Sequence, residues 1–113
     1  MESILTSIKK LLGIQEEYTS FDTDIIIHIN TVFSILTQLG LGPQEGFAIQ
    51  DKSAMWSDFI PENDPRLSMA KSLVGMRVKL LFDPSASSVV TDSMNRQIAE
   101  LEWRIKVACE TEY

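Results

Sequence analysis

The feature that most constrains this chain is the spacing of the apolar residues between positions 23 and 39. These residues recur every three or four positions, which is the period of an α-helix and not the alternation of a strand. Asp22 is the expected N-cap, and Gly40 follows as a helix-ending glycine. The spacing therefore predicts a helix over 23–39. Its apolar stripe comprises Ile25, Ile26, Ile29, Val32, Phe33, Leu36 and Leu39.

Further main helices are expected near 2–12, 65–82 and 88–110, with a short central helix near 54–60. Segment 65–82 has few polar positions, so it is expected to lie centrally. A turn-rich loop over 40–46 and a brief extended strand over 47–49 complete the chain. The prediction is an all-α fold: a single domain over 1–113, built as a small helical bundle of four main helices plus the short central helix. The expected helix ends are marked by Gly13, Ser53, Pro61, Asp64–Pro65 and Asp83–Pro84. The expected polar stripe of 65–82 is Ser68, Ser72, Gly75 and Lys79.

The last predicted helix carries two apolar stripes on opposite sides, at about 100° per residue. One stripe can face the core, and the other needs a second surface, which is either the N-terminal helix or another subunit. The first stripe comprises Met94, Ile98, Leu101, Ile105 and Ala108, and the second comprises Ala99, Trp103 and Val107. Trp103 is the larger anchor of a candidate oligomer interface. Trp56 and Phe59 of the short helix are also candidates for a partner interface, although core packing is the favoured interpretation of that pair.

Composition and charge exclude several classes of function. A chain of 113 residues, 44% of them hydrophobic, suffices for one core and is not that of a disordered protein. No apolar run is longer than three residues, as at Ile25–Ile27, which is far short of the roughly 20 residues of a membrane span, and no secretory signal is expected. One cysteine, Cys109, permits no internal disulfide and favours a reducing cytoplasm. The net charge is −6 without a Lys/Arg cluster, so nucleic-acid binding is not expected.

Candidate chemistry is sparse. The only histidine, His28, follows Asp24 by one helical turn, and such a pair can orient an imidazole or supply two metal ligands. No second histidine completes a metal motif, Cys109 has no obvious base beyond His28, and the glycines of 40–46 form no phosphate-binding motif. We therefore expect a protein that is not an enzyme, with no catalytic, metal or cofactor-binding residues and no cofactor.

Four stretches carry a resemblance to a known family: FDTDIIIHIN (21–30), LGLGP (39–43), LLFDPS (80–85) and MNRQIAELEWR (94–104). Together they resemble the small helical head–tail connector proteins (adaptor or head-completion proteins) of tailed phages and prophages of Gram-positive bacteria. The resemblance covers residues 2 to about 110. It implies a helical bundle, made in the cytoplasm of the bacterial host, that assembles as a homo-oligomeric ring on the portal protein, usually twelve-fold in the virion. It further implies that the ring joins the DNA-filled head to the stopper or tail completion protein and that DNA passes through without specific binding.

The residue patterns agree with a ring and leave two alternatives open. A second apolar stripe requires a neighbour, head-to-tail contacts can close into rings, and an acidic lining would not hold DNA. One alternative is a helical interaction or regulatory module with a helix-turn-helix element around 40–46, which the acidic charge disfavours. The other is a small hydrolase or metal enzyme centred on Asp24 and His28.

Overall fold

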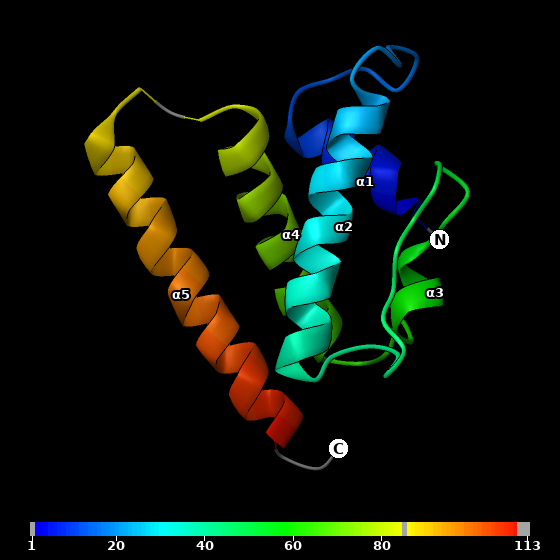
Figure 1. Ribbon diagram of the computed structural model, residues 1–113, viewed down its shortest axis with the longest axis vertical. Helices are drawn as coiled ribbons and strands as arrows, with labels where there is room; N and C mark the ends of the chain where they lie inside the picture. The colour runs from blue at the N-terminus through cyan, green and yellow to red at the C-terminus, as the bar shows by residue number, and fades with distance from the viewer. Residues whose placement is uncertain (1, 85, 111–113) are drawn as a thin grey trace.

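Five helices account for most of the computed structural model, which describes residues 2–84 and 86–110. They are α1 (Ile4–Leu11), α2 (Asp22–Leu39), α3 (Trp56–Phe59), α4 (Arg66–Phe82) and α5 (Ser88–Glu110), as labelled in Figure 1. No strand occurs in the described ranges, so the all-α prediction is confirmed. Ser85, the last residue of the third resembling stretch, lies outside these ranges. No helix in the described part of the chain is both long and apolar enough to cross a bilayer.

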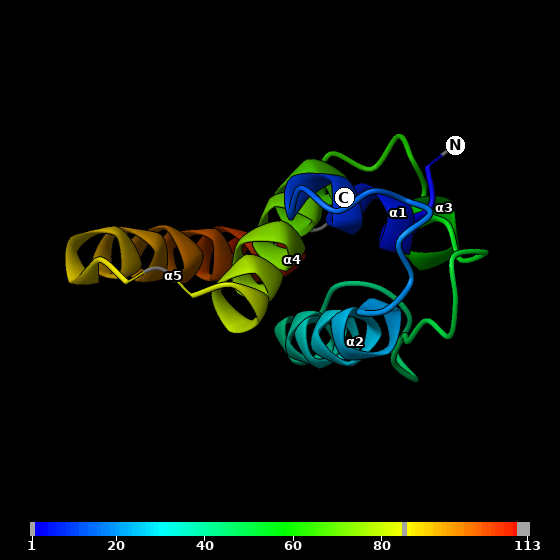
Figure 2. The same cartoon turned by 90° about the horizontal axis from the view of Figure 1, so that it is seen from above.

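Helix α4 is the central element, as its scarcity of polar positions predicted. It packs against α2, α5 and α1. Seen from above, α4 lies between α5 on one side and the α1–α2 pair on the other (Figure 2). Its buried residues therefore occur on more than one face of the helix. They are Leu67, Ala70, Leu73, Val74, Gly75 and Val78.

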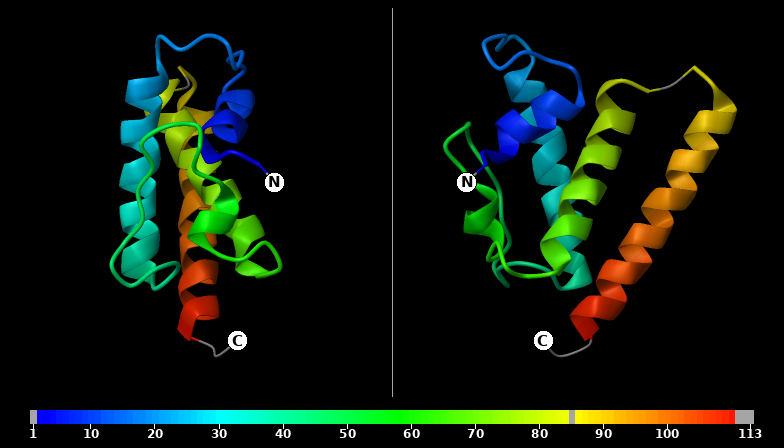
Figure 3. Two further views of the ribbon diagram at one scale, coloured as in Figure 1. Left: turned by 90° about the vertical axis from the view of Figure 1, so that its right-hand side faces the viewer. Right: turned by 180° about the vertical axis from the view of Figure 1, so that it is seen from behind.

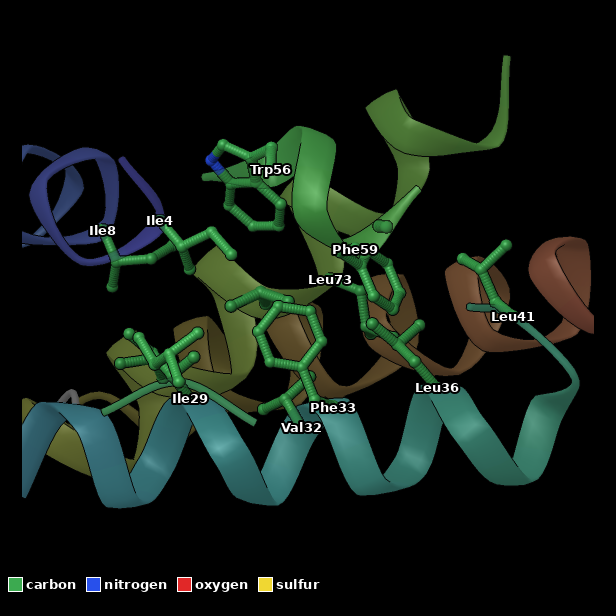
Figure 4. Close-up of a cluster of buried hydrophobic side chains, with 14 of the residues drawn as sticks. Ile4, Ile8, Ile29, Val32, Phe33, Leu36, Leu41, Trp56, Phe59 and Leu73 are labelled. Atoms are coloured by element: carbon green, nitrogen blue, oxygen red, sulfur yellow. The ribbon is translucent and has the colours of Figure 1, made fainter. Parts of the chain in front are cut away.

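The core is centred on Phe33 of α2, which contacts three other aromatic rings, and Figure 4 shows Trp56 and Phe59 among them. The ring centroids of Phe33 lie 4.7 Å from Phe59, 4.9 Å from Phe47 and 6.1 Å from Trp56. Trp56 also donates its indole N–H to the Ser7 hydroxyl at 2.9 Å. A buried indole is stable when its one donor is satisfied, so this bond lets Trp56 join α3 to α1.

The N-cap prediction for Asp22 was wrong. Phe21 occupies the cap position, and Asp22 is the first residue of α2. The Asp22 carboxylate lies 2.8 Å from the ammonium group of Lys9, whose side chain is 3% exposed. That ammonium also donates to the carbonyls of Glu16 at 2.9 Å and Tyr18 at 2.8 Å. Burying a lysine requires partners for its charge and its donors, and this tertiary requirement outweighed the local capping preference.

Three other helix starts differ by one or two residues from their predictions, and the first of them is α1, which begins at Ile4 and not at residue 2. Met55, not Ser53, is the cap of α3, and the Met55 backbone N–H donates to the Asp58 carboxylate at 2.8 Å. Ser53 instead donates both its backbone N–H, at 2.8 Å, and its hydroxyl to the carboxylate of Asp51, two residues earlier. Helix α4 begins at Arg66, with Pro65 at the cap, although the Asp64 carboxylate still accepts the Arg66 backbone N–H at 2.9 Å.

The expected strand over 47–49 was also wrong. Residues 47–49 form no strand, and the backbone of Ile49 pairs with a side chain and not with another strand. The Asn30 amide donates to the Ile49 carbonyl at 3.0 Å, and the Asn30 carbonyl oxygen accepts the Ile49 N–H at 2.8 Å. One side chain of α2 thus satisfies both backbone groups that a ladder would have used.

The loop over 40–46 depends on glycine. Gly40 ends α2 with a φ of 97°, and Gly42 has a φ of 90°. A β-carbon added at Gly42 would collide with the Phe59 ring, so the loop lies directly against the aromatic core. The predicted turn is therefore also a close backbone contact.

Candidate interaction surface

The structure does not develop the Asp24–His28 pair into a site. Asp24 is exposed and His28 is half-buried on α2. Among residues 2–84 and 86–110, no group of three histidine, cysteine, aspartate or glutamate side chains could hold a metal ion. Cys109 is half-buried near the end of α5, where its sulfur lies 3.7 Å from the Arg66 guanidinium. The Arg66 guanidinium also binds the Asp64 carboxyl and holds the pKa of Asp64 below its usual value.

The inner stripe of α5 packs against the rest of the bundle. Ile98, Ile105 and Ala108 are buried, and Met94 and Leu101 are half-buried. An ion pair also holds α5 to α4: Arg77 of α4 donates to the Glu102 carboxylate at 2.6 Å. Helix α5 is thereby held at the edge of the molecule, mainly through α4 (Figure 1).

The outer stripe of α5, here called the Trp103 ridge, consists of Ala99, Trp103 and Val107. All three residues are exposed, with 65% of Trp103 and 40% of Val107 accessible to solvent. The N-terminal helix, which could have covered this stripe, packs on α4 and α2 instead. The stripe could have been covered by the N-terminal helix or by another subunit. The first of these is excluded within one chain.

A groove lies between α1 and α4, and sequence reasoning missed it. This α1–α4 groove has a volume of about 610 Å³. Figure 3 (right) shows its two helices side by side, seen from behind. The floor is mainly apolar and the rim carries lysines. The apolar part of the lining comprises Ile8, Leu11, Trp56, Gly75, Met76 and Met94 of α5, and the rim includes Glu2, Lys10, Lys71 and Lys79.

Gly75 is the residue that shapes this groove. It belongs to the predicted polar stripe of α4, yet it is buried because Leu11 of α1 lies over it. A β-carbon at Gly75 would stand 2.7 Å from the Leu11 side chain. The sequence contained one signal of this close approach, the glycine inside a long helix. Glycine there costs about 1 kcal/mol relative to alanine, so its presence indicates a structural reason. Leu11 itself remains 59% exposed at the groove.

Trp56 and Phe59, the other interface candidates, lie in the core of the monomer. Trp56 is 2% exposed and Phe59 is 3% exposed. Burial of this kind matches the core interpretation of the pair, although Trp56 also lines the α1–α4 groove. The Trp103 ridge and the α1–α4 groove are two exposed features available to a partner, and other exposed apolar side chains include Ile27, Leu81 and Val89.

Comparison with known proteins adds one match. A family model described as "Phage connector protein" matches residues 4–112, which is nearly the whole chain. No curated protein and no solved structure matches this chain.

Proposed function

Because this chain belongs to the phage connector protein family, we propose that it forms a homo-oligomeric ring on the portal and joins the DNA-filled head to the stopper or tail completion protein. The ring is twelve-fold in the virion, as the sequence resemblance implies. The subunit is made in the cytoplasm of the host and ends at the head–tail interface of the virion. Its role is mechanical, and none of its side chains is required to react.

The observation that carries the ring is the exposed Trp103 ridge in a chain of this family. Most apolar side chains of this size are covered in the same bundle, but Trp103 is 65% exposed on an outer helix. Charged residues flank it, including the Glu100–Arg104 pair at 3.1 Å. An aromatic anchor within a charged rim is the common composition of a protein–protein interface.

Replacement of Trp103 tests the proposal. Trp103→Ala should keep the helical circular dichroism spectrum, because the side chain supports no part of the monomer core. Loss of a buried interface tryptophan commonly costs about 2 kcal/mol or more per contact, so the variant should shift toward monomer in sedimentation and fail to complete heads. If the isolated wild-type chain is monomeric, the same comparison is made with the portal protein present.

The matched control is Ile27→Ala, which removes another apolar side chain, 57% exposed, from α2. It should assemble and complete heads as the wild type does. Normal head completion by Trp103→Ala would contradict the proposal, and so would an equal defect in the two variants.

A further inference from the structure

We propose that the α1–α4 groove receives the Trp103 ridge of a second copy of this chain, in a head-to-tail contact. The inference rests on the proposed function and deepens it, because it names the receiving surface of each contact in the ring. Four features of the described residues support it: the matching lengths of the two surfaces, their apolar character, their charges and their positions on different sides of the subunit.

The lengths of ridge and groove agree. The ridge extends from Ala99 to Val107 along α5, and the α4 wall of the groove extends from Lys71 to Lys79. Each interval covers eight helical steps, or about 12 Å at about 1.5 Å per residue. An apolar helix face in an apolar groove is a recurrent mode of recognition, and a groove of about 610 Å³ has room for an indole ring and its neighbours.

The charges are complementary. Three lysines and one glutamate line the groove, and only Lys71 lies near that glutamate, with its ammonium 3.6 Å from Glu2. Lys10 and Lys79 are exposed at the rim. The partner is acidic, because each copy has a net charge of −6. Between Ala99 and Val107 the helix face within about 60° of Trp103 carries one acid and one base, and over the whole of α5 the same face carries three acids against two bases. These residues are Asp92, Glu100 and Glu110, with Arg96 and Lys106.

The positions of the two surfaces explain why they must belong to different copies. Trp103 lies on the side of α5 opposite Ile98 and Ile105, which are buried in the bundle. The groove lies between α1 and α4 and is also lined by Met94, which belongs to the inner stripe of α5 and not to the side that carries Trp103. Each copy therefore offers one ridge and one groove. A contact between unlike surfaces repeats from copy to copy and closes into a ring when the rotation allows it, whereas ridge-to-ridge pairing would stop at a dimer.

Cysteine cross-linking tests which surfaces meet. In a Cys109→Ser background, one set of chains carries Ser72→Cys in the groove and another carries Ala99→Cys on the ridge. Both positions are exposed on the surface of the chain. A short bismaleimide should join the two kinds of chain when they are mixed at high concentration, and neither kind alone. Thr31→Cys, exposed on α2, is the matched control and should give no product with either partner.

Charge reversal at the groove provides a second measurement. The double variant Lys10→Glu, Lys79→Glu should weaken self-association by about tenfold in sedimentation, because each rim charge contributes up to about 1 kcal/mol and reversal adds repulsion. The double variant Lys52→Glu, Lys106→Glu has the same change in net charge, but it is not a clean control. Lys52 is distant from the groove, whereas Lys106 belongs to the charged rim of the ridge itself. Lys52→Glu alone is therefore compared with Lys79→Glu alone, and only Lys79→Glu should weaken association.

The outcomes separate this inference from the proposed function. Cross-linking of Ala99→Cys chains with one another, or equal effects of Lys79→Glu and Lys52→Glu, would overturn the groove contact. If Trp103→Ala still blocked head completion in that case, the proposed function would stand. A chain that showed no cross-link at any concentration, with or without the portal protein, would also overturn the groove contact. Normal head completion by Trp103→Ala would then contradict the proposed function as well.

Discussion

Lys9 shows how one residue can decide the course of a segment. Its buried ammonium binds the Asp22 carboxylate and the carbonyls of Glu16 and Tyr18, so it fastens the connection between α1 and α2. The capping preference of Asp22 was visible in the sequence. Its ion pair was not, because the partner becomes available only when the connection folds back over α1. Local rules therefore predicted the place where α2 begins, and missed what Asp22 does there.

We expect Lys9→Met to lower the free energy of unfolding by about 2 kcal/mol. The methionine keeps the apolar stem, but it leaves two carbonyls and a carboxylate without their shared donor. Urea denaturation followed by circular dichroism measures the loss. Lys52→Met removes an exposed lysine and should change the free energy by less than about 0.5 kcal/mol. Similar values for the two variants would show that the Lys9 contacts are not stabilising.

At the scale of elements, the main helices were predictable to within about two residues. Their apolar periods are long, and proline or glycine marks the ends, as at Gly40 after α2 and Pro84 after α4. The partner of residues 47–49 was not predictable, because both of its hydrogen bonds come from Asn30, 19 positions earlier. The α1–α4 groove was missed for a similar reason. It depends on the placement of two helices, and single-helix patterns contain no such information.

Helix α5 provides a matched pair of charge variants. Glu102 binds Arg77 of α4, with both side chains at most about one-third exposed, whereas Glu100 pairs with Arg104 on the open surface. Glu102→Gln should lower the free energy of unfolding by about 1 kcal/mol, and Glu100→Gln by less than about 0.5 kcal/mol, because water screens the exposed pair. Urea unfolding of both variants measures the difference. Equal losses would mean that the Arg77–Glu102 pair does not hold α5 to the bundle.

At the scale of the whole molecule, charge and shape act together. The overall charge is −6, and the lysines that the fold gathers lie in the α1–α4 groove, which a neighbouring subunit would cover in the ring. The sequence predicted the acidic balance and the spare stripe on the last helix. The monomer leaves that stripe exposed. Neither composition nor periodicity indicated which surface would receive it.

The isolated protein should not bind duplex DNA at physiological salt, because a chain of this charge repels the phosphate backbone. Electrophoretic mobility shift at low and at physiological salt measures this. Single-stranded DNA serves as a second probe and should also remain unbound. Micromolar affinity with a steep salt dependence would contradict the view that DNA passes the ring without being held, and would favour the regulatory alternative.

The contrast between the two tryptophans has a practical consequence. Trp56 is enclosed by the core, with its indole N–H on the Ser7 hydroxyl, and Trp103 is open to water. The fluorescence of an indole shifts to longer wavelength as its surroundings become wet. Unfolding should therefore shift the emission of Trp56 to the red, while docking of the Trp103 ridge should shift the emission of Trp103 to the blue. The chain thus carries two native optical probes with opposite responses, and Trp56→Phe and Trp103→Phe variants would allow folding and assembly to be followed separately without an attached dye.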